Sequence, residues 1–297
     1  MNNRFSDISM RVFPECYPCF VRQANIAMEV GGVNGDSVPR VMKSVFRCLE
    51  RADYSNKTPA HVTSAMHRRI RRLLKADPFR GVKARYNSIA LKMYPELKEK
   101  VATSPRPLIT AARLAIAGNI IDFGIYDSVD IMGTVDRALD LNSALDVDDS
   151  DDFLLEVEEK EQVLYLLDNS GEVVFDRILI EELISRGRNV TAVVKAGPVI
   201  NDCTMEDATG AGLAGLCKII DNGSDHVGTI LEQCSMGFQE RFGRRDQLVI
   251  SKGQGNFETL MHEGSRIYFL FQAKCLVVAR LLGLGQGAML LARGGKS

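Results

Sequence analysis

Residues 163–172 read Val-Leu-Tyr-Leu-Leu-Asp-Asn-Ser-Gly-Glu, and this stretch decides the fold. Its five leading apolar residues show no alternation and are too few for a helix, which is typical of a strand buried on both faces. Residues 175–183 then place apolar side chains at helical spacing, and Gly187 is positioned to end that helix. Asp168 and Asn169 therefore stand where a central strand passes into a helix, the edge at which open α/β sheets bind ligands.

The composition is that of an ordinary globular protein. Of the 297 residues, 45% are hydrophobic and 25% are charged. The 37 Lys and Arg residues balance 38 Asp and Glu residues, so we expect no nucleic-acid partner and no membrane partner. The chain shows no apolar run of about 18 residues and no signal-like leader, and its seven cysteines are too scattered for a disulfide framework. These features predict a cytoplasmic protein; a homo-oligomer is left open.

The chain is predicted to have two domains. Residues 1–160 form a mostly helical N-terminal domain, and residues 161–297 form an α/β/α catalytic domain. Within the first, helices are expected over Ser37–Arg51 and after Thr58-Pro59, which supplies a cap and an N1 proline. The arginine-rich face of the second of these helices is interpreted as a solvated surface rather than an RNA site.

The segment between these helices and residue 163 has a less distinct pattern. A helix is expected from Leu108 to about Ala117, and helical residues 105–140 are the candidates to pack on the second domain. Gly118-Asn119 is interpreted as a helix C-cap with a left-handed glycine. Residues 131–141 suggest one more short helix, and Asp146–Glu161 reads as an acidic, solvated connection, partly helical in the alternative.

From residue 162 the pattern becomes an alternation of strands and helices, which predicts a mostly parallel sheet and a three-layer α/β/α sandwich. Each strand is followed by polar residues, and parallel strands bring such ends to one edge. The predicted strands are Val163–Leu167, Val190–Val194, Lys218–Ile220, Leu248–Ile250 and Ile267–Phe271.

Asp168, Asn169 and Asp202 are the best candidates for a metal site. Two carboxylates and one amide oxygen are hard ligands, suited to Mg²⁺ or Mn²⁺. An isolated Asp at such a place is more often a helix cap, but three candidates at strand ends favour a shared site. With only four histidines and no H-E-x-x-H motif, a zinc hydrolase is not expected.

Three further motifs carry candidate residues. Lys252-Gly253-Gln254-Gly255-Asn256-Phe257-Glu258 is neither a Walker loop nor a full G-x-G-x-x-G, so it is interpreted as an anion-binding turn or a plain strand–helix turn. Gly283-x-Gly285-x-Gly287 is interpreted as a loop. The lone C-x-x-C at Cys16 and Cys19 allows a metal site, a redox pair or idle thiols.

Together these motifs resemble one family. The matching residues are Cys16-x-x-Cys19, Gly118-Asn119-Ile120-Ile121-Asp122, Asp168-Asn169-Ser170-Gly171-Glu172, Asn201-Asp202-Cys203-Thr204, the Lys252–Glu258 turn and Ala273-Lys274-Cys275. In this order, over almost the whole chain, the set is similar to the damage-control phosphatases. These were long catalogued as a domain of unknown function and are related to acidic-residue methyltransferase-like proteins. The C-x-x-C resembles the archaeal and microbial branch.

The resemblance implies a metal-dependent phosphatase of small phosphorylated metabolites, such as sugar phosphates or damaged by-products. It implies a divalent metal (Mn²⁺, Mg²⁺, Co²⁺ or Ni²⁺) held by Asp168, Asn169 and Asp202. By the same resemblance, the family's substrate contacts fall on the Gln254–Glu258 turn and on Lys274. Gln254 and Glu258 replace the ends of the Asp-x-Asn-x-Arg pattern of eukaryotic members, which leaves the substrate open. Together with Lys252 and Gly253 of the anion-binding interpretation, and with Asn119 and Asp122, which match a family motif, the candidate substrate-binding residues are Asn119, Asp122, Lys252, Gly253, Gln254, Gly255, Asn256, Phe257, Glu258 and Lys274.

The expected chemistry is phosphoryl transfer to a metal-positioned water, with an aspartyl-phosphate on Asp168 as the second option. Glu172 is expected to orient that water or to stabilise its helix N-terminus. Asp168, Asn169 and Glu172 are therefore the catalytic candidates. Two other classes stay open: an S-adenosylmethionine-dependent carboxyl methyltransferase and a non-catalytic metabolite- or metal-binding protein.

Overall fold

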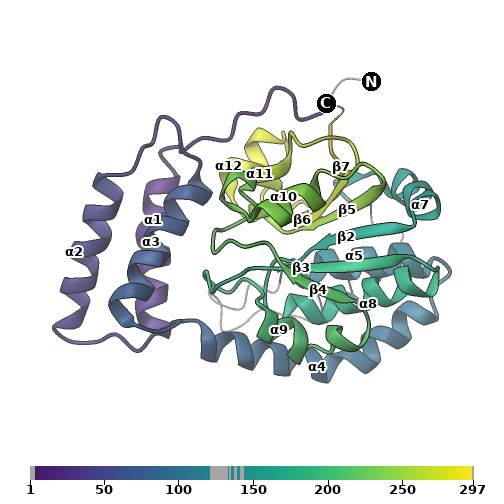
Figure 1. Ribbon diagram of the computed structural model, residues 1–297, viewed down its shortest axis with the longest axis horizontal. Coiled ribbons are helices and arrows are strands. Elements are labelled where there is room, and N and C mark those ends of the chain that lie inside the picture. Colours follow the sequence, from purple (N-terminus) through teal and green to yellow (C-terminus); the bar gives the residue numbers. More distant parts are fainter. Residues whose placement is uncertain (1–3, 121–132, 134, 137–138, 141–143, 296–297) are drawn as a thin grey trace.

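A computed structural model describes residues 4–120, 133, 135–136, 139–140 and 144–295 of the chain. A sheet stands at its centre and helices cover both faces (Figure 1). The strands are β1 Val147–Asp148, β2 Gln162–Leu166, β3 Asn189–Val194, β4 Lys218–Asp221, β5 Gln247–Lys252, β6 Ile267–Gln272 and β7 Met289–Arg293. The α-helices are α1 Cys16–Val30, α2 Ser37–Glu50, α3 Pro59–Leu74, α4 Arg80–Ala102, α5 Pro107–Ile120, α7 Ser150–Glu159, α8 Glu172–Ser185, α9 Met205–Gly210, α10 Met236–Phe242, α11 Gln254–Leu260 and α12 Leu276–Leu281.

The sheet is mostly parallel, as predicted. Its strand order is β1-β7-β6-β5-β2-β3-β4, and β6 and β7 form the antiparallel pair. All five predicted strands are present, each with its ends shifted by at most a few residues. Two strands were not predicted: β7 follows the Gly283–Gly287 loop, and the two-residue β1 lies inside the stretch interpreted as a solvated connection.

The two faces of the sheet pack into separate cores because side chains alternate along each strand. On β2, Val163 and Tyr165 join the cluster under α5 and α8, whereas Leu164 and Leu166 join the cluster under α10, α11 and α12. Tyr165 and Leu164 are both fully buried, which explains why the strand reads as an unbroken apolar run. The predicted α/β/α sandwich is confirmed.

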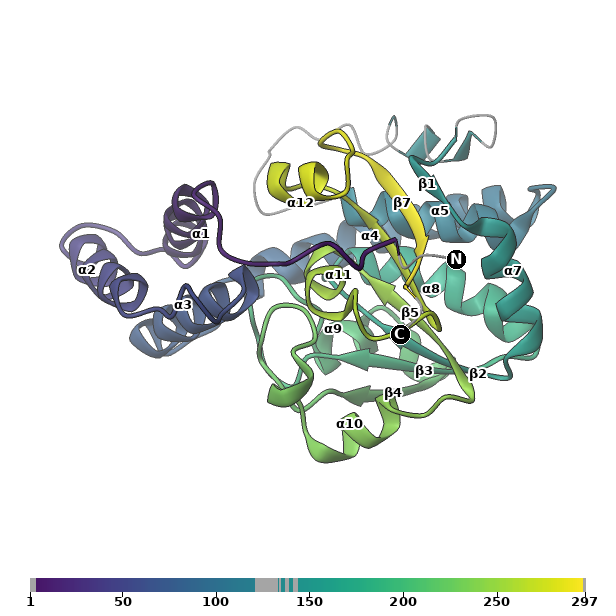
Figure 2. The same ribbon diagram turned by 90° about the horizontal axis from the view of Figure 1, so that it is seen from above.

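The N-terminal helices divide into two groups. Helices α1, α2 and α3 share their own apolar cluster and project to one side of the sheet (Figure 2). Helices α4 and α5 instead belong to the core on the α8 side of the sheet, where Leu97 and Leu114 are fully buried. The domain boundary at residue 160 stays a prediction, but the packing changes near Phe79, which belongs to the first cluster.

Two helical predictions need correction. Gly118 does not end a helix, because α5 continues to Ile120. Its missing Cβ matters for packing, since a Cβ there would lie 2.8 Å from Cβ of Phe175 on α8. Residues 146–161 contain α7 as well as β1, and Phe153 of α7 is fully buried, so this stretch is not simply solvated. The predicted helix at 131–141 lies mostly outside the described residues.

The prediction of a helix after Thr58-Pro59 is confirmed by α3. Thr58 and His61 form a capping box at the start of α3, and Pro59 occupies the first helical position. Within the described ranges, none of the helices is long and apolar enough to cross a membrane.

Candidate active site

The carboxyl ends of β2, β3 and β5 lie side by side and build the site. Leu166 of β2 is in register with Val193 of β3 and with Ser251 of β5. A polar residue stands at or just beyond the carboxyl end of each strand: Asp168 is two residues after β2, Lys195 directly follows β3, and Lys252 is the last residue of β5. The predicted edge is therefore formed by adjacent strands in the centre of the sheet.

Asp202 reaches this edge through the segment that follows β3. Residues 169 and 202 form an isolated antiparallel bridge. The Cys203 N–H donates to the Asp168 carbonyl at 2.7 Å, and the Ser170 N–H donates to the Asn201 carbonyl at 2.9 Å. These backbone bonds bring together the three predicted metal ligands, although about 33 residues separate them in the chain.

The backbone near Asp202 is strained. Ile200 has φ of 44°, a left-handed conformation that is unfavourable for a β-branched residue. On the neighbouring turn, Gly171 has φ of 79°, and its N–H donates to Oδ1 of Asn87 from α4 at 2.6 Å. Such strain persists only where the surroundings fix it, and it gathers at functional sites.

Two amides hold two carboxylates. Nδ2 of Asn119, from α5, donates to Asp168 Oδ2 at 3.0 Å and to Glu172 Oε2 at 2.9 Å. Nδ2 of Asn169 donates to the same two oxygens, at 2.7 and 3.0 Å. Oδ1 of Asn119 accepts the Gln272 N–H at 3.3 Å, which fixes the orientation of this amide. In Asn169 the amide nitrogen serves both acids, which leaves its oxygen as the atom to face a cation.

The electrostatics of the two aspartates favour a bound cation. Burial raises the pKa of Asp168 well above its usual value, and Glu172 and Asp202 add to this shift. Burial also raises the pKa of Asp202, to about 6, against the opposing effect of Lys195, whose Nζ lies 3.6 Å from Asp202 Oδ2. That oxygen is buried without a hydrogen-bond partner. A cation between the two acids would satisfy this oxygen and relieve their repulsion.

The residues present fit a hard divalent metal. Asp168 and Asp202 supply carboxylate oxygens and Asn169 supplies an amide oxygen, a set typical of Mg²⁺ and Mn²⁺. In the part of the chain that the structure describes, no three histidine, cysteine, aspartate or glutamate side chains are grouped to hold an ion. The candidate set therefore depends on the Asn169 oxygen and on waters for its remaining ligands.

Lys252 is placed differently from the prediction. Its fully buried ammonium donates to Glu172 Oε1 at 2.5 Å, Asp176 Oδ1 at 2.7 Å and the Ala115 carbonyl at 2.8 Å. An ammonium has three protons, so none remains for a phosphoryl oxygen. Burial alone would lower the pKa of Lys252, but Asp176 and Glu172 raise it to about 12. Lys252 therefore acts beneath the edge, as a counter-charge for buried acids.

Glu172 is likewise more enclosed than predicted. It is the first residue of α8 and is fully buried, and its two oxygens accept bonds from Asn119, Asn169 and Lys252. With these donors in place, Glu172 is suited to orient the amides that hold Asp168. Direct contact with a water at the edge is not part of this arrangement.

The predicted substrate turn divides into an inner and an outer part. The side chain of Phe257 stacks on Phe271 at 4.8 Å in the core, and the Asn256 amide bonds to the Lys252 carbonyl at 2.8 Å. Both side chains therefore point into the protein, and a contact of either residue with a ligand through its backbone stays a prediction. Gln254, Gly255 and Glu258 are partly exposed, and Nε2 of Gln254 donates to Glu258 Oε1 at 2.7 Å.

Gly253 has φ of 81° and precedes α11. A Cβ at this position would overlap the carboxylate of Asp168, so only glycine leaves room for that side chain. The Gly253 N–H donates to the Leu270 carbonyl at 3.2 Å, so the N–H groups that remain for an anion belong to the residues after it.

Two lysines border the aspartates. Lys274 follows β6, is partly exposed, and lies close enough to Asp168 to lower the pKa of its carboxyl. Lys195, which was not among the predicted site residues, is buried and donates to the Gly228 carbonyl as well as facing Asp202. Its signal in the sequence was a lone charge directly after a buried strand. Asp122 lies outside the described residues.

This fold defines an α/β protein whose polar side chains gather at the carboxyl edge of a mostly parallel sheet, the place where open α/β sheets bind small ligands. A family model of the damage-control phosphatase ARMT1-like domain matches residues 12–290. A damage-control phosphatase of Pyrococcus horikoshii is 37% identical over 289 residues, which cover 96% of this chain and 98% of that one. The chain therefore belongs to the damage-control phosphatase ARMT1-like family.

Further relatives agree with this family. An uncharacterized protein of Methanocaldococcus jannaschii is 34% identical over 295 residues, 96% of each chain. A damage-control phosphatase of Archaeoglobus fulgidus is 31% identical over 288 residues, 94% of this chain and 98% of that one. The crystal structure of a DUF89 family protein from P. horikoshii has a TM-score of 0.88 and 36% identity, covering 96% of this chain and 100% of that one. The named relatives support a phosphatase.

Proposed function

We propose that the chain is a metal-dependent phosphatase that hydrolyses phosphomonoesters of small phosphorylated metabolites. The observation that carries the proposal is the buried carboxylate of Asp202, which the bridge between Asn169 and Asp202 brings beside Asp168 and which keeps one oxygen without a hydrogen-bond partner. Mn²⁺, Mg²⁺, Co²⁺ or Ni²⁺ would be held by Asp168, Asn169 and Asp202. When bound, such an ion supplies Lewis-acid stabilisation of the charge on a phosphoryl group.

The chain's own residues would bind the rest of that group. Lys274 contributes positive charge beside Asp168. The N–H groups of Gln254 and Gly255, at the start of α11, are directed as donors toward the same edge. In a loose transition state the equatorial oxygens carry the charge, so donors placed around them accelerate transfer.

The preferred nucleophile is a water, with Asp168 as the alternative. Oδ2 of Asp168 is held by Asn119 and Asn169, so Oδ1 is the atom that remains for a ligand or for attack. Glu172 acts as a positioning residue, because it fixes both amides from below while Lys252 neutralises it. If Asp168 is the nucleophile instead of water, the aspartyl-phosphate that it forms would be hydrolysed in a second step.

The substrate class is proposed from the family and from the outer part of the turn. The family resemblance favours sugar phosphates or damaged phosphometabolites, and two relatives are named damage-control phosphatases. Gln254 and Glu258 are bonded to each other at the mouth of the site, at 2.7 Å. Burial raises the pKa of Glu258 to about 7, so this pair would present an amide and an acid that is only partly ionised near neutral pH to the non-phosphate part of a substrate.

Phosphate release from p-nitrophenyl phosphate tests the proposal. We expect turnover with at least one of Mg²⁺, Mn²⁺, Co²⁺ and Ni²⁺ and none with chelator. Asp202→Asn removes one charge at nearly constant shape and should reduce kcat/KM by at least about a hundredfold. Asp246→Asn is the matched control, because Asp246 is exposed and pairs only with surface Arg244 among the contacts described.

The other classes predict different results. Absence of turnover with every metal, together with metal binding by calorimetry, would favour a binding protein. A rise in melting temperature with S-adenosylmethionine, and no phosphate release, would favour a methyltransferase. A panel of phosphorylated metabolites assayed with the best metal would then rank the substrates.

A further inference from the structure

One side chain of α4 links the two segments that carry the candidate metal ligands. These segments are the turn of residues 168–172 after β2 and residues 201–204 before α9. Oδ1 of Asn87 accepts the N–H of Gly171, in the first segment, at 2.6 Å. Nδ2 of Asn87 donates to Oδ1 of Asp207, the third residue of α9, at 3.1 Å. The amide of Asn87 therefore spans the interval between the turn and α9.

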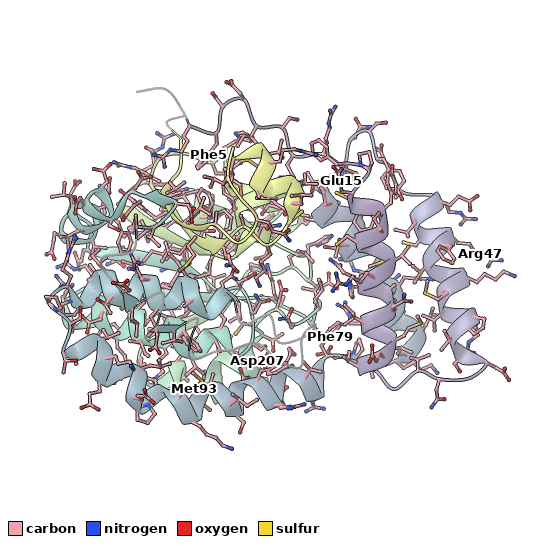
Figure 3. All side chains as sticks on the ribbon, turned by 180° about the vertical axis from the view of Figure 1, so that it is seen from behind. Phe5, Glu15, Arg47, Phe79, Met93 and Asp207 are labelled. Carbon is pink, nitrogen blue, oxygen red and sulfur yellow. The ribbon has the colours of Figure 1, made fainter. Side chains whose placement is uncertain are left out.

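Asp207 continues this connection into the second segment. Its Oδ2 accepts the Thr204 N–H at 3.0 Å and the Thr204 hydroxyl at 2.6 Å, and the two residues form a capping box at the start of α9. The same oxygen accepts a bond at 2.9 Å from Nζ of Lys83, one turn before Asn87 on α4, and Figure 3 shows Asp207 beside that helix. Thr204 is two residues from Asp202, so the connection ends next to a proposed ligand.

The charges along this connection fix the direction of the Asn87 amide. Lys83 and Asp207 are both buried. Burial alone would raise the pKa of Asp207, but Lys83 and the Thr204 donors hold it below its usual value, so the carboxyl group is ionised at neutral pH. A carboxylate accepts hydrogen bonds and cannot donate them, so it draws the nitrogen of the Asn87 amide. The amide oxygen is thereby presented to Gly171.

The end of the first segment needs an external acceptor. Gly171 is buried, with φ of 79° and ψ of −55°, a conformation that glycine adopts more readily than other residues. It directly precedes α8, so its N–H has no acceptor within that helix. The bond to Asn87 satisfies this N–H and fixes the end of the turn that carries Asp168 and Asn169.

We propose that Asn87, oriented by Asp207, is a positioning residue that holds the turn 168–172 in place for a cation before the cation binds. This inference rests on the proposed function, because it takes the ligands of these two segments as given. Backbone bonds at Ser170 and Cys203 already join the segments, and Asn87 adds a bond at the far end of the turn. A preformed site binds its metal more tightly because less ordering accompanies binding. Polar residues that support the ligands of a metal are typically worth 10- to 100-fold in affinity.

Binding of Mn²⁺ to the full chain, measured by calorimetry, tests this role without relying on turnover. Asn87→Ala removes the acceptor of the Gly171 N–H and should raise the Mn²⁺ dissociation constant at least about tenfold. Tyr94→Phe is the matched control, because the Tyr94 hydroxyl on the same helix bonds to Glu181 of α8, also at 2.6 Å. Both variants lose a bond between α4 and α8, but only Asn87→Ala affects the turn. Tyr94→Phe should therefore keep the wild-type affinity.

The outcomes separate this inference from the proposed function. Mn²⁺ binding by the wild type with the same affinity in Asn87→Ala, or an equal loss in Tyr94→Phe, would overturn the inference and leave the metal site standing. A wild-type chain that binds none of the four divalent metals would refute the metal site, and the inference with it. In a double-mutant cycle, Asn87→Ala and Asp207→Asn should weaken binding by less than the sum of their separate effects, because both break one connection. Fully additive losses would overturn the part assigned to Asp207.

Hydrogen exchange of the wild-type chain keeps the inference testable if Asn87→Ala does not fold. The Gly171 amide should exchange slowly in the metal-free protein, as read by mass spectrometry of peptides that span residues 168–176, and Mn²⁺ should change its rate little. Rapid exchange that becomes slow only after Mn²⁺ is added would show that the cation itself orders the turn. That result would overturn the proposal.

Discussion

Replacement of Gly253 by alanine tests whether the position of Asp168 controls the activity. Gly253 has φ of 81°, and an added Cβ would overlap Cγ and both oxygens of Asp168. The carboxylate would have to move by on the order of 1 Å to regain van der Waals separation. This movement would also disturb the bonds from Asn119 and Asn169 to Oδ2, at 3.0 and 2.7 Å.

The expected effect follows from that displacement. A misplacement of about 1 Å at a reacting group costs roughly a hundredfold in rate. This factor corresponds to about 2.7 kcal/mol of transition-state stabilisation. Gly253 has φ of 81° and ψ of 156°, a backbone region almost restricted to glycine, so alanine there separately costs roughly 1–3 kcal/mol of folding free energy. Activity and stability therefore need to be measured together.

The assay compares kcat/KM with p-nitrophenyl phosphate, the metal concentration for half-maximal rate, and the thermal midpoint. Gly187→Ala is the matched control, because Gly187 has φ of 78° with open space where a Cβ would lie. Both variants place alanine at a positive φ, but only Gly253→Ala reaches Asp168. We expect the hundredfold loss and a higher metal requirement in Gly253→Ala alone. Unchanged kcat/KM in Gly253→Ala, or an equal loss in Gly187→Ala, would refute the reasoning.

Three further predictions concern stability. Lys252→Met leaves the buried Glu172 and Asp176 without their counter-charge, so the free energy of unfolding in denaturant should fall by about 3–5 kcal/mol. Lys218→Met, at the exposed start of β4, is the control and should change this free energy little. Burial, with a contribution from Arg71, lowers the pKa of His67 to about 3. Because the unfolded chain takes up this proton near pH 6.5, the free energy of unfolding should fall by on the order of 4 kcal/mol between pH 6.5 and pH 3. His67→Gln should show a shallower acid dependence, and an identical one would contradict this assignment. Gly118→Ala should lower the thermal midpoint by the equivalent of about 1–3 kcal/mol, because its Cβ would meet Phe175, and an unchanged midpoint would mean that α5 and α8 can separate.

The central strands and the approach of Asp168, Asn169 and Asp202 to one edge could be predicted because both follow from short-range patterns. An apolar run such as Val163–Leu167 has no polar face, so it indicates a strand covered on both sides. Parallel strands then place their carboxyl ends together, which brought Asp168 and Asp202 to one edge. Strand β7 lacked such a signal, because a five-residue apolar stretch after a glycine-rich loop is equally compatible with a short helix.

The contacts of the Asn119 amide with two carboxylates could not be predicted from residue spacing. Asn119 belongs to α5, and its bonds to Asp168 and Glu172 depend on how α5 packs against α8. That approach depends on Gly118, which the sequence pattern alone had suggested as a helix end. The same glycine signal arises from a left-handed turn and from close helix packing, and only the tertiary structure distinguishes them.

The position of Lys252, in contrast, follows from strand alternation. On β5, Leu248 and Ile250 face the core under α5 and α8, whereas Val249 faces the opposite core. Lys252 has the parity of Leu248 and Ile250, so its side chain has to point toward α8 rather than outward from the edge. Glu172 and Asp176 are four residues apart on α8, so they present carboxylates on one face of that helix. A lysine directed into a buried helix face that carries two acids serves as their counter-charge, and its three donated bonds leave no proton for a phosphoryl oxygen.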